Sequence, residues 1–257
     1  MTLVEHLAAS RLAGRVATPV SSCVENAGRL VTGDPDCTFG LSDWRDASYD
    51  DVVAALSACG VDLGATEDPA ARPWVDPDVA AAAVAAHRRE LAAVAARRGR
   101  VLIATGHAFA LLPHYTAVAR ALAEAGCQLL RPLDAVRDRF PLPDGDAGSV
   151  RFFDGVGTLV VHGNLLHSHR PDYMEAMLEE AILDENGGDV DLVVADHGYA
   201  GAAVEAGIPT LSIADVNDPA LPLAQVRGRT EAVLPIDDNL APRLFVPVTA
   251  ALLDWDA

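Results

Sequence analysis

The sequence predicts an α/β protein in which a mostly parallel sheet carries helices on both faces, a Rossmann-like layered architecture, with a helical N-terminal portion. Two observations support this fold class. From residue 100 onward, short apolar runs alternate with helical segments, which is typical of β-α-β units. Before residue 100 the patterns are helical and no clear strand is found. A chain of 257 residues can form one such fold, so we expect a single domain over 1–257, with a mainly helical portion at 1–99 and a parallel-sheet core at 100–257.

The N-terminal portion is predicted to consist of helices joined by loops. Helical spacing of apolar residues, a capping sequence at Ser48 and a Pro-to-Gly pattern indicate three helices, over residues 2–12, 48–60 and 76–98. The stretch that ends at Val31 could be a second short helix or an irregular arm.

Five apolar runs are predicted to be strands of one sheet, at 101–105, 127–130, 192–195, 210–214 and 232–236. Helices are expected between them, at 113–124, 198–207 and 219–225, so that most strands pair in parallel. Residues 131–149 are expected to form a loop. The Asp154-Gly155 pair predicts a hairpin turn, and Pro171 is expected to open a further helix.

The charge of the chain limits its possible partners. The sequence has 37 acidic and 19 basic residues and a formal net charge of −18, which argues against nucleic acid and against an anionic membrane surface as partners. Every basic residue is an arginine, so Schiff-base chemistry and a P-loop lysine are excluded. The N-terminus does not resemble a targeting segment and no window is long enough to span a membrane, so we expect a cytoplasmic protein.

Polar residues follow the predicted strands at the points where these strands end. They are His107, Asp196, His197, Asp215, Asn217, Asp218, Asp237 and Asp238. Because ligands of parallel sheets bind outside the carboxyl ends of the strands, we expect these side chains to form one site. Any one of the aspartates or asparagines could instead be a helix cap or a turn former.

A second group of polar residues lies within nine positions, at 162–170. It contains three histidines, one asparagine and one arginine, which are His162, His167, His169, Asn164 and Arg170. Such a density of imidazoles is difficult to explain by packing alone, and we expect the segment to reach the same site.

These residue types suggest metal-assisted chemistry on a phosphate ester. Mixed carboxylate and imidazole ligands suit Mn²⁺, Fe²⁺ or Zn²⁺, whereas carboxylates and amides alone suit Mg²⁺. The predicted metal ligands are Asp196, His197, Asp215, Asn217 and Asp218. The predicted catalytic residues are His107, His162 and His197. Substrate binding is assigned to three groups of residues. The backbone amides of Gly106 and Gly198 open helices and could bind phosphate oxygens. Guanidinium groups could clamp the anion, and polar side chains of the histidine-rich segment could contact the substrate; these residues are Arg170, Arg227 and Arg229, and Asn164, His167 and His169.

Several enzyme classes are disfavoured by missing motifs. The sequence has neither the G-x-S-x-G elbow of α/β-hydrolases nor a G-x-G-x-x-G fingerprint after a strand. A phosphoaspartate mechanism would place D-x-D after the first core strand, where Thr105-Gly106-His107 stands instead.

Motifs along the core also carry a family resemblance. The most specific are residues 195–203 (Ala-Asp-His-Gly-Tyr-Ala-Gly-Ala-Ala) and 214–221 (Ala-Asp-Val-Asn-Asp-Pro-Ala-Leu), accompanied by Ala104-Thr105-Gly106-His107 and Asp237-Asp238-Asn239. Together they resemble the actinobacterial proteins grouped as a phosphatase family, over most of residues 100–247. The resemblance implies a phosphatase, while the residue roles given above come from placement along the predicted sheet.

Two functions are compatible with these features. The leading hypothesis is a metal-dependent phosphatase that hydrolyses a small phosphorylated metabolite with a divalent ion such as Mg²⁺, Mn²⁺ or Zn²⁺. The alternative is a non-catalytic α/β module that binds a nucleotide or sugar phosphate at the same edge of the sheet.

Overall fold

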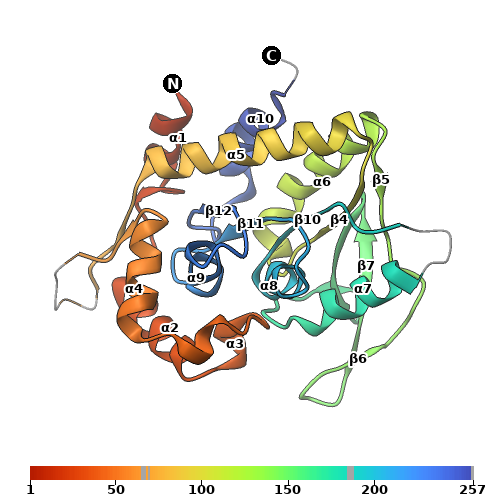
Figure 1. Cartoon of the computed structure of the whole chain (residues 1–257), viewed down its shortest axis with the longest axis horizontal. Helices are drawn as coiled ribbons and strands as arrows, with labels where there is room; N and C mark the ends of the chain where they lie inside the picture. The colour runs from red at the N-terminus through yellow and green to blue at the C-terminus, as the bar shows by residue number, and fades with distance from the viewer. Residues whose placement is uncertain (65–67, 69, 184–187, 256–257) are drawn as a thin grey trace.

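In the computed structural model, which describes residues 1–64, 68, 70–183 and 188–255, nine strands form one mixed sheet (Figure 1). The order is β12-β11-β10-β4-β8-β7-β6, with β5 paired to β4 and β9 to β8. Six of these strands pair in parallel. They are β4 (Arg100–Ala104), β5 (Gln128–Leu129), β8 (Val156–Val161), β10 (Leu192–Asp196), β11 (Thr210–Ala214) and β12 (Ala232–Pro235). The five strands predicted from the sequence therefore lie in one mostly parallel sheet, as expected.

An antiparallel group extends one edge of this sheet. It consists of β6 (Phe140–Pro141), β7 (Ala147–Phe153), β8 and β9 (Asn164–Leu165). The predicted Asp154-Gly155 turn is confirmed, with φ values of 49° and 89° that match the turn type favoured in two-residue hairpins. The prediction of a loop throughout 131–149 is wrong in two places, because β6 lies at Phe140–Pro141 and β7 begins at Ala147. The strand β7 shows the reason. Its first residues have low strand propensity, and pairing such as Ser149 with Val160 decides their conformation.

Helices cover both faces of the sheet, and the core is divided accordingly. In β4, Val101 and Ile103 join one apolar cluster while Leu102 and Ala104 join the other. The first face is covered by α1 (Leu3–Ser10), α5 (Pro77–Ala96), α6 (Ala108–Glu124) and α10 (Val246–Leu253). The second face is covered by α7 (Asp172–Leu183), α8 (His197–Glu205) and α9 (Ala220–Val226).

The N-terminal portion shares its core with the sheet. Leu7 and Val84 belong to the first cluster, and Leu30 and Phe39 belong to the second. This portion contains α2 (Val20–Val31), α3 (Pro35–Thr38), a 3₁₀ turn (Asp43–Asp46) and α4 (Tyr49–Ala58), of which α4 begins with the predicted capping box at Ser48. The stretch before Val31 is thus a helix and not an irregular arm. The sequence did not predict a small antiparallel sheet of β1 (Gly14–Arg15), β3 (Trp74–Val75) and β2 (Val61–Asp62), because strands of two residues carry no periodic pattern.

Helix α6 begins five residues before its predicted start at Pro113. Proline in the interior of a helix removes one backbone hydrogen bond. Proline is therefore more common in the first turn of a helix than in its interior. Here Pro113 is inside the helix, and burial of Ala108, Ala110 and Leu111 keeps the preceding turn helical. The earlier start places the N-terminal end of α6 directly after His107. Among the described residues, no helix is both long and apolar enough to cross a membrane.

The buried His87 leads to a prediction about stability and pH. Its ring is 3 % exposed and bonds the Ala232 carbonyl at 2.8 Å, and burial lowers its pKa to about 4. The unfolded chain binds a proton on this ring near pH 6.5, whereas the folded chain does so only near pH 4. The stability that the neutral ring provides is therefore complete above pH 6.5 and is lost as the pH falls towards 4. We expect His87→Gln, which keeps a donor for the carbonyl, to reduce the loss of unfolding free energy between pH 7 and pH 5 by about 2 kcal/mol. Denaturant unfolding of both proteins at the two pH values measures this difference, and equal losses would contradict it.

Candidate functional site

A cavity of about 290 Å³ lies at the carboxyl ends of four neighbouring strands, β12, β11, β10 and β4. Its lining residues follow these strands or come from the histidine-rich segment, and they are His107, His167, His169, His197, Asp215, Asn217, Asp218, Asp238 and Asn239. The parallel topology brings the strand ends together at one edge of the sheet, as the sequence predicted.

The buried carboxylate of Asp196 holds His197 in place. Oδ2 of Asp196 accepts a hydrogen bond from the Thr105 hydroxyl at 2.5 Å, and Oδ1 accepts one from the Gly106 amide at 2.7 Å. Nδ1 of His197 lies 2.8 Å from the same Oδ1, so the ring is anchored at this nitrogen. His197 has a φ of 47°, a left-handed conformation that costs energy for a residue other than glycine. The backbone of His197 is therefore strained. Because Nδ1 of its ring is bonded to Asp196, the other ring nitrogen, Nε2, is left for the cavity.

The charges around His197 shift both pKa values of this pair. Burial alone would lower the pKa of His197, but the hydrogen bond to Asp196 and the negative charge of Asp218 raise it to about 10. Burial would raise the pKa of Asp196, yet the hydrogen bond and the charge of His197 hold it below its ordinary value.

A second imidazole is anchored in the same manner. Nδ1 of His107 lies 3.0 Å from Oδ1 of Asp238, a residue that is only 1 % exposed. Burial would lower the pKa of His107, but the hydrogen bond and the charge of Asp238 raise it. The other carboxylate oxygen, Oδ2 of Asp238, accepts no hydrogen bond from the part of the chain that the structure describes, and it lies 3.8 Å from Nε2 of His197.

Three imidazoles converge in the cavity and could hold a metal ion. The ligand atoms of His107, His167 and His197 all lie within 4.8 Å of one another. Partial loss of solvation and the neighbouring imidazoles lower the pKa of the exposed His167 to about 4, which leaves this ring neutral. His169 stacks on His197 with ring centroids 4.8 Å apart, while its Nδ1 lies 2.7 Å from the Asp36 carbonyl.

The other predicted metal ligands occupy different places relative to the cavity. Asp218 lies with Oδ2 3.4 Å from Nε2 of His197, and burial raises its pKa to about 7 although the charge of His197 opposes the shift. Asp215 accepts the Asp238 amide at 3.2 Å, and Asn217 donates to the Ser22 hydroxyl at 2.7 Å. Asp196 stands behind His197 with both oxygens bonded, which favours a positioning role over the predicted role as a ligand.

His162 and Asn164, predicted for catalysis and substrate binding, lie outside the cavity. His162 and Gly163, with φ values of 49° and 81°, form the turn between β8 and β9. The exposed His162 ring pairs with Asp146 at 2.9 Å. The strand β8 pairs with β4 only at Val156 and Gly157, so its later residues extend beyond the edge that the parallel strands share and pair with β9. The placement of His162 in the site was therefore wrong.

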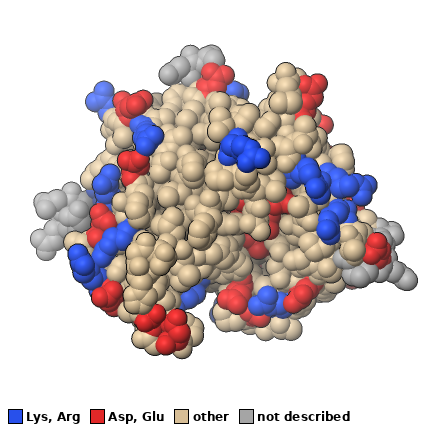
Figure 2. Space-filling view, turned by 180° about the vertical axis from the view of Figure 1, so that it is seen from behind, with Lys and Arg blue, Asp and Glu red and all other residues tan. Residues whose placement is uncertain are grey.

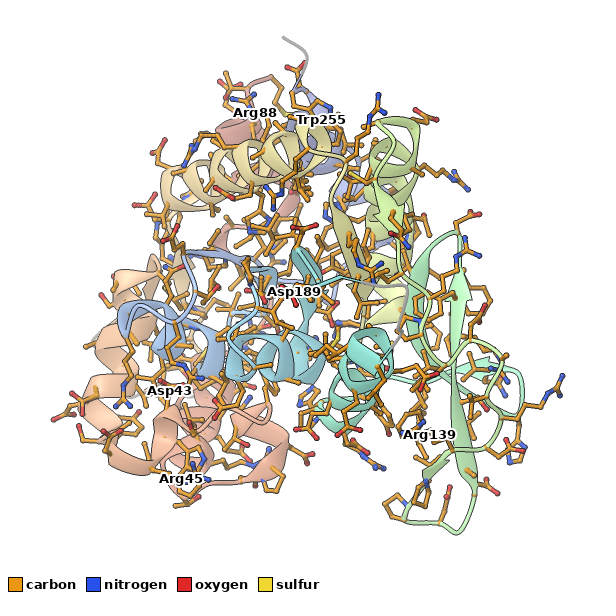
Figure 3. All side chains as sticks on the ribbon, turned by 45° about the vertical axis from the view of Figure 1, so that its right-hand side comes forward. Asp43, Arg45, Arg88, Arg139, Asp189 and Trp255 are labelled. Carbon is orange, nitrogen blue, oxygen red and sulfur yellow. The ribbon has the colours of Figure 1, made fainter. Side chains whose placement is uncertain are left out.

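The three arginines predicted to bind phosphate are committed to carboxylates of the protein. Arg229 pairs with Asp43 at 2.9 Å and lines a separate cavity at the amino ends of the strands. Arg227 donates to the Asp43 carbonyl and to Asp46, and Figure 3 shows Asp43 where the N-terminal helices meet α9. Arg170 donates to Asp172 at 2.9 Å and to the Pro141 carbonyl at 2.9 Å. None of the three lines the cavity described above.

Glycines Gly106 and Gly198, predicted to bind phosphate through their amides, instead allow two backbone segments to touch. A Cβ atom at Gly106 would lie 2.3 Å from the Ser168 carbonyl oxygen, and one at Gly198 would lie 2.1 Å from the His169 carbonyl oxygen. The Gly106 amide is also already bonded to Asp196. These contacts press the histidine-rich segment against the ends of β4 and β10, which brings His167 and His169 to the cavity.

Sequence reasoning missed two residues that build the site. Thr105 was read only as the end of a strand, yet its hydroxyl bonds Asp196 and also accepts the His107 amide at 3.0 Å. Asn239 was not included among the site residues, although it lines the cavity. Their position at strand ends was a usable signal for both.

Comparison with known proteins gives two matches. A family model described as Phosphatase matches residues 1–256. The protein named Phosphatase SCO2771 from Streptomyces coelicolor (strain ATCC BAA-471 / A3(2) / M145) is 36 % identical over 262 residues, covering 98 % of this chain and 94 % of the relative.

The glycine contacts predict different outcomes for two similar substitutions. Gly198→Ala places a methyl group against the His169 carbonyl, so we expect it to lower the free energy of unfolding by about 1–3 kcal/mol and to displace the histidine-rich segment. Gly28→Ala in α2 is the matched control, since no atom lies within 4 Å of its Cβ, and it should stabilise the protein by up to about 1 kcal/mol. Denaturant unfolding measures both effects. Equal stability of the two variants would show that the close approach at Gly198 is not required.

Proposed function

The chain belongs to the phosphatase family, as its motifs predicted, and from this premise we propose that it hydrolyses phosphate esters in the cavity at the strand ends with the help of a divalent metal ion. The proposed substrate is a small phosphorylated metabolite, since a cavity of about 290 Å³ is at the lower end of the sizes of small-molecule sites.

One observation carries the proposal of metal dependence. The cavity is lined by three carboxylates, and none of the lining residues that the structure describes is an arginine or lysine. On the face shown in Figure 2, a few acidic side chains lie near the middle, while most arginines and the other acidic side chains lie towards the periphery. A phosphate ester is itself an anion, and the carboxylates of the lining oppose its entry. A divalent cation reverses the local charge and allows the ester to enter.

The available ligand atoms fit a metal ion. His107 and His197 each hold a buried carboxylate through Nδ1, which leaves Nε2 of both rings for the cavity where His167 joins them. Metal-bound imidazoles commonly have their second nitrogen bonded to a carboxylate, which orients the ring. We assign His107, His167 and His197 as the ligands, a set that favours Zn²⁺ or Mn²⁺ over Mg²⁺.

The remaining groups have roles that follow from their positions. An ion held by His107, His167 and His197 would supply Lewis-acid chemistry for the phosphoryl group and for water. Asp196 and Thr105 keep His197 oriented through the bonds described above. His169, held at Nδ1 by the Asp36 carbonyl, can direct its other nitrogen to a phosphoryl oxygen. Asp196 and Thr105 therefore position a metal ligand, and His169 positions the ester.

The first test is a panel of generic and metabolite phosphate esters. The protein is treated with chelator and then assayed with Mg²⁺, Mn²⁺ or Zn²⁺. We expect hydrolysis of at least one small ester, loss of activity with chelator and recovery on addition of Zn²⁺ or Mn²⁺. Hydrolysis that persists without metal would refute metal dependence. Binding of phosphate esters without hydrolysis under any condition would support a non-catalytic binding module instead.

Two histidine substitutions test the location of the site. His107→Ala removes a proposed ligand, so we expect kcat/KM to fall by at least about 10²-fold, because a catalytic metal contributes several kcal/mol. His162→Ala is the matched control, since this exposed ring lies in the β8–β9 turn, and its activity should stay within about twofold of the parent. Circular dichroism confirms that both variants fold. A larger loss of activity in His162→Ala than in His107→Ala would indicate that the site lies at the β8–β9 turn and not in the cavity.

A further inference from the structure

We infer that a second cavity beside the first binds the organic group of the phosphate ester, and that this group is apolar, as in an alkyl or aryl phosphate. This inference rests on the proposed function and extends it, because it names the class of substrate that the same site selects. The second cavity has a volume of about 330 Å³. Its walls come from the β6–β7 connection, from residues 166–170 and from the beginning of α7, and Asp36 of α3 also lines it.

The two cavities are neighbours because they share two histidines. His167 and His169 line both of them. The ring of His167 is one of the three proposed to hold the metal ion, and the ring of His169 is proposed to contact a phosphoryl oxygen. An ester whose phosphoryl group binds at these rings can therefore place its organic group in the second cavity.

The first cavity suits only the phosphoryl end of an ester. Each of its nine lining residues is a histidine, an aspartate or an asparagine. Sites for small molecules usually combine a few polar groups with a mostly apolar lining, and the first cavity has no apolar side chain to contact an organic group. The apolar part of the site is therefore expected next to it.

The second cavity supplies this apolar surface. Leu142 and Pro143 line it from the β6–β7 connection, and Leu166 and Tyr173 line it from the other side of the histidine-rich segment and from α7. Leu166 is 38 % exposed. A single exposed leucine is ordinary on a protein surface, but here apolar side chains from separate segments line one cavity beside a proposed phosphate site. An apolar group that enters it removes both surfaces from water, which is favourable.

Most polar side chains of the second cavity already have partners. The hydroxyl oxygen of Ser168 accepts the Arg170 amide at 3.2 Å. The guanidinium of Arg170 donates to both carboxylate oxygens of Asp172 and to the Pro141 carbonyl. A sugar or another polyol would lose water from its hydroxyl groups and find few free partners here, whereas an apolar group has no such cost. The lining therefore favours an apolar ester over a hydroxylated one.

The test is a comparison of phosphonates, which carry the anionic end of an ester but lack the bond that a phosphatase cleaves. Isothermal titration calorimetry of the full chain with saturating Mn²⁺ measures the dissociation constants of methylphosphonate, butylphosphonate and dihydroxypropylphosphonate. Each buried methylene group strengthens binding by about fourfold. We expect butylphosphonate to bind at least about tenfold more tightly than either of the other two compounds, because several methylene groups are added and their burial is partial.

Two substitutions in the walls test the location of this subsite. Leu166→Ser removes apolar surface, so the ratio of the affinities for butylphosphonate and methylphosphonate should fall by about fivefold. Leu142→Ser should act in the same direction, and it replaces the first variant if that variant does not fold by circular dichroism. The matched control is Leu183→Ser, since Leu183 is an exposed leucine at the end of α7, about 15 Å along the helix from Tyr173. Its affinity ratio should equal that of the parent.

Several results would overturn the inference. They are equal affinities for butylphosphonate and methylphosphonate, tighter binding of dihydroxypropylphosphonate, a ratio that both wall variants leave unchanged, or no binding of any phosphonate. The proposed phosphatase activity would still stand in each case if an ester is hydrolysed. A preference for butylphosphonate that the wall variants reduce, without hydrolysis of any ester, would have the reverse meaning, because the apolar subsite would be supported and the proposed function would fail.

Discussion

The hydrogen bonds of the buried Asp196 carboxylate are the interaction on which the site depends. They come from the Thr105 hydroxyl and the Gly106 amide after β4 and from the His197 ring after β10. An ionised carboxylate without such donors would be strongly destabilised in the interior. With them, Asp196 joins two neighbouring strand ends and fixes the orientation of the imidazole between them. The strained backbone of His197 is tolerated because these contacts determine it from several sides.

Close backbone packing extends this arrangement to a segment outside the parallel strands. Gly106 and Gly198 have no side chain, so the carbonyls of Ser168 and His169 can approach them at distances that a Cβ atom would prevent. The amide of Ser168 also donates to the Gly106 carbonyl at 3.0 Å. Glycines that sequence reasoning assigned to phosphate binding are therefore needed to assemble the site, and the imidazoles of His167 and His169 reach the cavity through them.

The electrostatics of the cavity connect the fold to its proposed chemistry. The arginines predicted to bind the anionic substrate form ion pairs with aspartates and do not line the cavity, whose lining contains carboxylates and imidazoles. Cations bound to these groups would supply positive charge to a cavity whose described lining contains no arginine or lysine. The same carboxylates that repel an ester when they are alone become an attractive site when they hold metal ions.

Local patterns in the sequence determined most of the fold and the edge at which the site lies. Apolar runs, caps and turn residues act over a few positions, and parallel strands present their carboxyl ends at one edge. The sequence alone therefore places His107, His197, Asp215 and Asp218 at that edge. The partner of each polar side chain was decided only by tertiary structure. Arg229 meets Asp43, 186 positions away, His162 turns outward in a hairpin, and Asp238 divides its oxygens between His107 and the cavity. Such pairings depend on how distant segments pack, and no local pattern in the chain records them.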